Sequence, residues 1–152
     1  MSTERVSTDP VPGGAAPRPQ GDYIPAVRHG DIIYTAGMTP RRDGRLVVTG
    51  AVGAAVSPEA AHSAAGLAAA NALAAARAAL PPQTGLTCLR MTVYVACAPG
   101  FTALSAVADG ASAVIREHLG ADALPARSAI GVQTLPSGAP VEVELIAAVL
   151  TG

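Results

Sequence analysis

The chain contains no lysine and no tryptophan, and it has only three tyrosines, one phenylalanine and two cysteines. All ten basic residues are arginines, and eleven acidic residues bring the formal net charge to −1. The absence of lysine excludes a lysine Schiff base and, with it, most pyridoxal-type catalysis. Because the charges are few, balanced and scattered, we expect no nucleic-acid partner.

The two cysteines, Cys88 and Cys97, lie nine residues apart in a segment whose pattern predicts one strand. A strand cannot fold back to pair them, so we expect two free thiols and a reducing, cytoplasmic location.

The sequence has no CxxC or HExxH motif, so we expect no metal site. The stretch Ala60–Leu80 is mostly alanine and is interrupted by polar residues, so we expect no membrane span.

Alanine takes the place of the missing large side chains: 34 of the 152 residues are alanine. Such a core fills space by bringing backbones close together. Residues 1–20 contain four prolines and few large apolar residues. They are therefore predicted to be a disordered N-terminal arm, followed by a single domain over residues 21–152.

Two helices are predicted from capping signals and apolar periodicity. The first begins after Ser57 as N-cap and ends near Leu80, where two prolines follow. The second covers Phe101–Leu119 and ends at Gly120. Alternation predicts the strands Ala26–Arg28, Asp31–Ala36, Leu46–Val48 (a short edge strand), Leu86–Cys97, Arg127–Leu135 and Val141–Leu150.

The last two strands are predicted to pair as an antiparallel hairpin through Pro136-Ser137-Gly138. Their apolar faces coincide if paired residue numbers sum to about 275, which places Arg127 and Glu142 together on the opposite face. In that register the two residues lie about 20 Å apart along the ladder, too far for one small substrate. We therefore expect a site that uses both residues to lie between two subunits.

The element order ββ-α-β-α-ββ predicts an α+β sandwich of two layers, with one sheet and both helices on one of its faces. The other face is expected to mix charges with Ala129, Gly131, Ile146 and Ala148. Such a face is too apolar for open water, so we expect it to be buried against other copies of the chain.

Two segments resemble the RidA family, also called YjgF or L-PSP: ALPARSAIGVQTLPSGAPVEVELIAAV and, before the first helix, DIIYTAGMTP. The resemblance spans about Tyr23 to Leu150, and the AGMTP loop points to a divergent branch of the family. It implies a homotrimer with a chorismate-mutase-like fold and one mixed sheet. It also implies cofactor-free hydrolysis of 2-imino and 2-enamino acids to 2-keto acids and ammonia.

The resemblance assigns catalytic roles to two residues. Arg127 matches the arginine that binds the substrate carboxylate, for which a guanidinium fork is well suited. Glu142 matches the glutamate that positions the attacking water. Glu144 is an alternative to Glu142 in this role. A structural ion pair at the subunit interface, for example with Glu144, is an alternative role for Arg127.

Three further residues are assigned to substrate binding. Tyr23 matches a tyrosine that lines the family's site, and Gly37 matches a glycine whose backbone approaches the ligand. Ser105 aligns with an asparagine of the family archetype. The chain departs from the archetype at Met38, in place of a glutamine, and at Ala129, in place of a cysteine.

Two other functions compete with imine deamination. One is a non-catalytic trimer that binds a small carboxylate in a regulatory or pathway-accessory role. The other is the ribonuclease activity sometimes attributed to the family, which the lack of lysine makes the least favoured.

Overall fold

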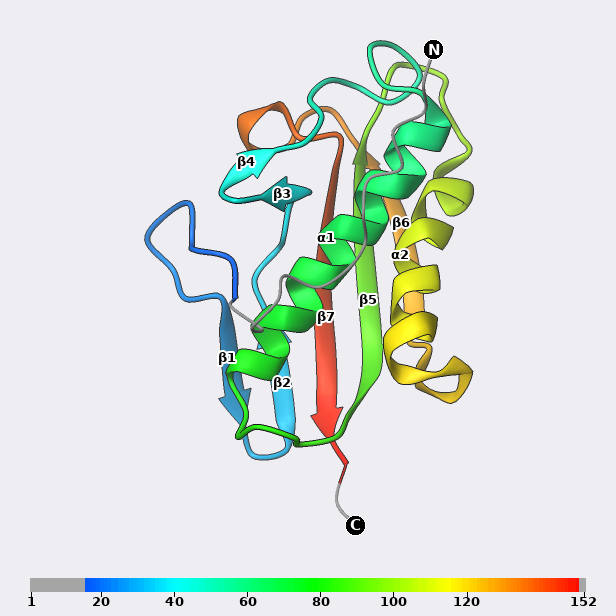
Figure 1. Ribbon diagram of the computed structural model, residues 1–152. Coiled ribbons are helices and arrows are strands. Elements are labelled where there is room, and N and C mark those ends of the chain that lie inside the picture. The colour runs from blue at the N-terminus through cyan, green and yellow to red at the C-terminus, as the bar shows by residue number, and fades with distance from the viewer. Residues whose placement is uncertain (1–15, 151–152) are drawn as a thin grey trace.

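The computed structural model describes residues 16–150, which form one mixed five-stranded sheet and two helices (Figure 1). Only β5 and β6 run parallel, and the other neighbouring strands are antiparallel. The α+β prediction is therefore confirmed. The sheet order is β1 (Ala26–His29), β2 (Ile32–Thr35), β7 (Val141–Val149), β5 (Leu86–Ala96) and β6 (Ala126–Val132).

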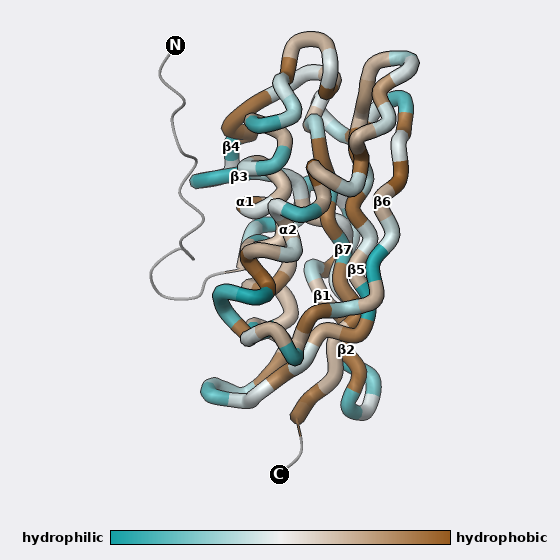
Figure 2. Tube along the Cα trace, turned by 90° about the vertical axis from the view of Figure 1, so that its right-hand side faces the viewer, coloured by the Kyte–Doolittle hydropathy of each residue, from teal (hydrophilic) through white to brown (hydrophobic). Residues whose placement is uncertain are grey.

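Both helices cover the same face of the sheet, as Figure 2 shows from the side. Helix α1 (Pro58–Ala78) begins where the Ser57 hydroxyl accepts a hydrogen bond from the backbone N–H of Ala60, at 3.1 Å. Helix α2 (Leu104–Leu119) ends at Gly120, whose φ of 89° few other residues adopt. The capping signals therefore placed both helices to within a few residues.

The buried face of α1 is wide, since 13 of its 21 residues are buried. The helix packs against α2 as well as against the sheet. At the crossing, a Cβ on Gly110 would overlap the carbonyl oxygen of His62. The His62 Nδ1–H also donates to the carbonyl of Ala106, at 2.9 Å. Small residues therefore allow the two backbones to touch.

The predicted C-terminal hairpin is wrong, because β5 lies between β6 and β7. Strand β6 runs parallel to β5, with α2 as the crossover, and β7 inserts between β2 and β5. The connection over residues 133–140 includes a 3-10 turn at Pro136–Gly138 and passes the end of β5, where the Ala96 N–H donates to the Pro140 carbonyl at 2.9 Å. Hairpin loops usually have two to five residues, so this longer loop can step over a strand.

The predicted faces of β6 are also inverted. Arg127 and Ala129 pair with Met91 and Val93, which are fully buried on the helix side. A Cβ on Gly131 would contact Cys97 and Leu104, also on that side. Ser128 and Ile130 therefore occupy the uncovered face. Strand periodicity separates the two faces but does not identify which one the helices cover.

Two smaller predictions fail locally. In the predicted strand Leu86–Cys97, regular alternation places Leu89 on the same face as the buried Met91. Leu89 is instead exposed, because a β-bulge between Cys88 and Arg90 shifts the register. Leu46–Val48 is not an edge strand of the main sheet. Instead, β4 (Arg45–Leu46) pairs only with β3 (Arg41–Arg42) in a separate small hairpin.

The uncovered face of the sheet, called here the open face, carries large apolar side chains. Val27, Tyr34, Leu89 and Ile130 are each 41–47% exposed. Of the predicted N-terminal arm, residues 1–15 lie outside the described residues. Within residues 16–150, no helix has the length and apolar character needed to cross a membrane.

We predict that Gly110→Ala destabilises the protein by about 1–3 kcal/mol, because the new methyl group overpacks the contact with His62. In most helices the same change stabilises by about 1 kcal/mol, so the sign of the effect is diagnostic. Urea unfolding of the wild type and the variant at one protein concentration measures it.

Ala113→Gly on the exposed side of α2 is the control. It is expected to cost about 1 kcal/mol from helix propensity alone. A stabilising Gly110→Ala change would contradict the close approach of the two helices.

Candidate functional site

Arg127 lies on the edge strand β6, and its side chain turns towards α2. Its Nη1 donates to Asp109 Oδ1 at 2.8 Å and to Ser112 Oγ at 2.9 Å. Its Nη2 donates to Ser105 Oγ at 2.7 Å. The structure thus brings together two residues of the predicted site, Arg127 and Ser105. We call Arg127, Ser105, Asp109 and Ser112 the arginine half.

Asp109 and Ser112 are not among the site residues predicted from the sequence. The signal that could have found them is their spacing from Ser105, four and then three residues, which places all three on one stripe of a helix. This polar stripe runs beside the apolar stripe that contains Ala108 and Ala111.

Glu142 lies on β7 and faces the open side of the sheet. It pairs across the ladder with Tyr94 of β5. On the other side, a Cβ added to Gly37 would lie only 2.6 Å from Glu142 Cδ, so any side chain at this position would push the carboxyl group out of its present place. The next residue, Met38, forms a β-bridge with Val143 and fixes this approach.

The Glu142 carboxyl is half-buried, and this burial raises its pKa above the ordinary value of 4.5. The nearby negative charge of Glu144 raises the pKa further. The Tyr94 hydroxyl donates to Glu144 Oε1 at 2.8 Å, a bond that raises the pKa of Tyr94. We call Glu142, Glu144, Tyr94 and Gly37 the glutamate half.

The two halves are separated within one chain. Arg127 pairs with Met91 of β5 and points to the helix side, whereas Glu142 pairs with Tyr94 and points to the open side. Two strand spacings and three residues along β5 place their Cα atoms about 14 Å apart. Within the described residues of one chain, the ion-pair partner of Arg127 is Asp109 and not Glu144.

Tyr23 lies just before β1 and is 46% exposed. Its hydroxyl accepts a hydrogen bond from the backbone N–H of Gln20, at 3.1 Å. The carbonyl of Pro25, two residues later, accepts from the N–H of Ala36, which precedes Gly37. The backbone at Pro25 therefore lies beside the residue before Gly37, whereas the Tyr23 side chain hydrogen-bonds back to Gln20 and, among the described residues, to neither half.

Among residues 16–150, the histidines, the cysteines and the remaining carboxylates form no metal-binding cluster. Cys88 and Cys97 are free thiols, as predicted. Burial raises the pKa of Cys88 to about 11, so this thiol stays protonated and is a poor nucleophile at neutral pH.

The model of the family described as endoribonuclease L-PSP matches residues 13–149. The chain belongs to this family. Among L-PSP relatives, Protein TCP17 of Trypanosoma cruzi is 33% identical over 134 residues, covering 87% of this chain and 84% of that protein. The predicted membership of the RidA, YjgF or L-PSP family is thus confirmed.

Solved structures similar to this L-PSP chain include Atu1372 of Agrobacterium tumefaciens, a protein of unknown function. It is 34% identical with a TM-score of 0.81, covering 85% of this chain and 82% of that one. The YjgF gene product of E. coli is 23% identical with a TM-score of 0.66, covering 92% and 98% of the two chains. At 23% identity, the similarity to the YjgF gene product shows only that the two proteins share a fold.

Two of the positions that depart from the L-PSP archetype, Met38 and Ala129, belong to the hydrophobic core or pack against it. Met38 is 7% exposed and is part of the hydrophobic core. Ala129, on β6, is partly buried and packs against this core. Neither position presents a polar group to the glutamate half.

We predict that Glu142→Gln makes this L-PSP protein more stable than the wild type at neutral pH. The pKa of Glu142 is raised on folding, so the folded state binds this proton more tightly than the unfolded chain does. The ionised carboxyl therefore lowers stability at neutral pH, and this loss disappears as the pH falls through the raised pKa to below 4.5.

Urea midpoints of the two proteins at neutral pH and at about pH 4 test this linkage. The difference in urea midpoint between Glu142→Gln and the wild type should become smaller at the lower pH. Glu117→Gln, at an exposed position of α2, is the control and should show no such trend. A Glu142→Gln variant less stable than wild type at neutral pH would refute the burial argument.

Proposed function

We propose that the protein is a homotrimer that hydrolyses 2-imino and 2-enamino acids to 2-keto acids and ammonia, in clefts between subunits. The observation that carries the proposal is the division of the predicted site into two halves on opposite faces of the sheet. Each half holds one of the two groups that the reaction needs: a guanidinium for the carboxylate and a carboxyl group for the water.

The position of each half favours assembly. The arginine half lies at the edge strand β6, and the glutamate half lies in the middle of the open face. If the edge of one copy packs against the open face of the next, the two halves meet and the exposed apolar side chains of that face are covered. A head-to-tail contact of this kind can close into a ring, and three copies are what the family resemblance implies.

Arg127 would bind the substrate carboxylate. In the single chain Asp109 neutralises it, so a ligand must displace that pair. The Arg127 side chain is 19% exposed and that of Asp109 is 62% exposed, so water screens the pair at the Asp109 end and weakens it. A bidentate carboxylate can therefore replace Asp109 at low cost, while Ser105 and Ser112 keep the guanidinium in place.

Glu142 would accept a proton from water as the water oxygen attacks the imine carbon. The resulting tetrahedral amino alcohol then receives that proton on nitrogen, and the C–N bond breaks. Ammonia leaves as the C=O bond forms and the hydroxyl proton passes to Glu142. A carboxyl group with a raised pKa suits both transfers, since it accepts and returns a proton with little loss of driving force. No cofactor is needed, because the iminium carbon is already electrophilic.

We predict that Arg127→Ala and Glu142→Gln each abolish the acceleration of imine hydrolysis, and that mixing the two variants restores part of it. An intact cleft needs Arg127 from one subunit and Glu142 from its neighbour. When equal amounts of the two variants are unfolded and refolded together, subunits combine at random. Each cleft then has an intact Arg127 in about half of the cases and an intact Glu142 in about half, so about a quarter of the wild-type rate should return. The assay follows the lifetime of an imine generated by an amino acid oxidase.

Arg116→Gln, at an exposed position of α2, is the control and should retain full activity. A mixture as inactive as its components would contradict a shared cleft. Wild-type protein that binds 2-keto acids through Arg127 yet leaves every imine lifetime unchanged would favour the alternative, a carboxylate-binding trimer without turnover.

We also predict a pH effect from Glu144. If Glu142 acts as the base, kcat/KM rises with pH through the Glu142 pKa, which lies above 4.5. Glu144→Gln removes a negative charge that raises this pKa, so the acid limb of the profile should move to lower pH. Glu117→Gln should leave the limb in place. A limb that stays fixed in Glu144→Gln argues that another group is the base.

A further inference from the structure

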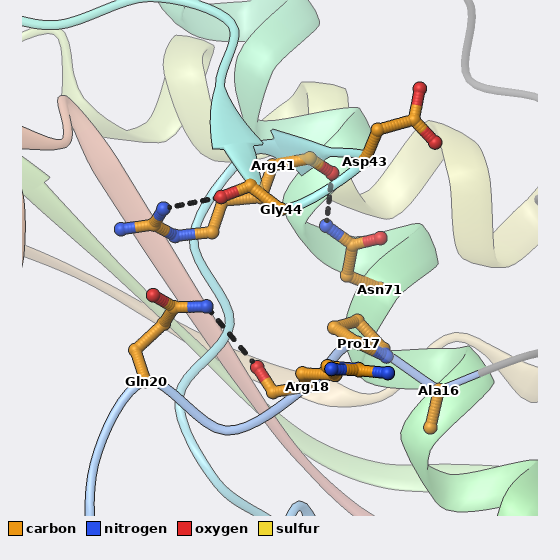
Figure 3. Close-up of a pocket in the computed structure, with 8 residues that line it drawn as sticks. All are labelled: Ala16, Pro17, Arg18, Gln20, Arg41, Asp43, Gly44 and Asn71. Carbon is orange, nitrogen blue, oxygen red and sulfur yellow. Dashed lines mark hydrogen bonds between the residues drawn. The ribbon is translucent and has the colours of Figure 1, made fainter.

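A cavity of about 440 Å³ lies between α1, the β3–β4 hairpin and residues 16–20 (Figure 3). We infer that this cavity binds a small organic oxyanion, a carboxylate or a phosphate ester, through the guanidinium groups of two arginines. The side chains and backbone that line it include Arg18, Gln20, Arg41, Asp43, Gly44 and Asn71.

The cavity lining has a formal charge of +1, because it contains Arg18, Arg41 and one carboxylate, that of Asp43. Among residues 16–150, no carboxylate forms an ion pair with Arg18 or Arg41. Figure 3 shows the Asp43 carboxylate directed away from Arg18 and Gln20. Guanidinium groups match the geometry of carboxylates and phosphates, so an oxyanion is the ligand chemistry that this cavity favours.

Arg41 is held in place before any ligand binds. Its Nε donates to Thr39 Oγ1 at 3.2 Å, and its Nη1 donates to the carbonyl of Gly44 at 2.9 Å. Its Nη2 makes no hydrogen bond within the described residues. A side chain fixed in this way loses little conformational entropy when it binds, which favours affinity.

Asn71 provides a buried polar wall. It is 7% exposed, and its Nδ2 donates to the carbonyls of Thr39 and Arg41, at 3.1 and 3.0 Å. Its Oδ1 accepts no hydrogen bond from residues 16–150. A ligand that also carries an O–H or N–H group, such as a hydroxy acid, can therefore satisfy this acceptor.

The walls of the cavity continue into the segments of the candidate site. Gln20 bonds to Tyr23, and Thr39 follows Gly37 by two residues. A bound oxyanion would therefore restrain both segments that lead to the glutamate half. This consequence rests on the proposed function, whereas the binding inference does not.

Calorimetric titration of the full chain with citrate and, separately, with glycerol 3-phosphate tests the inference. We expect saturable binding of at least one probe, and the probe that binds identifies a carboxylate or a phosphate site. Arg18→Gln and Arg41→Gln should each weaken binding about tenfold or more, as loss of a charge-assisted hydrogen bond predicts.

Arg45→Gln removes the same charge from the neighbouring strand β4 without touching the cavity, and it should bind as the wild type does. Arg18 is exposed, so its variant should fold normally even if Arg41→Gln loosens the hairpin. Arg127→Ala should also bind normally, which separates this cavity from the proposed cleft. No saturable binding, or equal affinity in Arg18→Gln and Arg45→Gln, would overturn the inference.

Discussion

The insertion of β7 between β2 and β5 determines where the candidate site residues lie. It places Glu142 in the middle of the sheet, between Tyr94 on one side and Gly37 on the other. It also moves β6 to the edge, so that Arg127 contacts α2 and no acidic residue of the open face. The division into two halves follows from this strand order, and a working cleft of the proposed kind requires a neighbouring subunit.

Each half owes its geometry to small residues. On the glutamate side, the missing side chain of Gly37 gives the carboxyl group a partly buried place, which raises its pKa. On the arginine side, two serines of α2 reach the guanidinium directly. A small residue also sets the contact between the two helices, because Gly110 of α2 lies directly against the backbone of α1 at His62.

Sequence reasoning predicted the elements and the layers because capping and periodicity are local signals. Ser57 and Gly120 mark helix ends through their own conformational preferences, whatever the tertiary fold. Strand order depends on pairings distant in sequence, so the loop before Val141 could indicate either a hairpin or a step over β5. The predicted face of Arg127 was wrong for a related reason. Alternation assigns residues to two faces but does not say which face the helices cover.

The alanine-rich contact between the helices has an energetic consequence of its own. Alanine has no side-chain torsion to immobilise, so ordering this layer sacrifices little rotamer entropy, although each residue also buries little apolar area. The stability of this layer must then come from close packing of the two helix backbones along their contact. Over evolutionary time such a layer should accept exchanges among the smallest residues and resist every gain in volume, leaving divergence to the loops and the sheet surface.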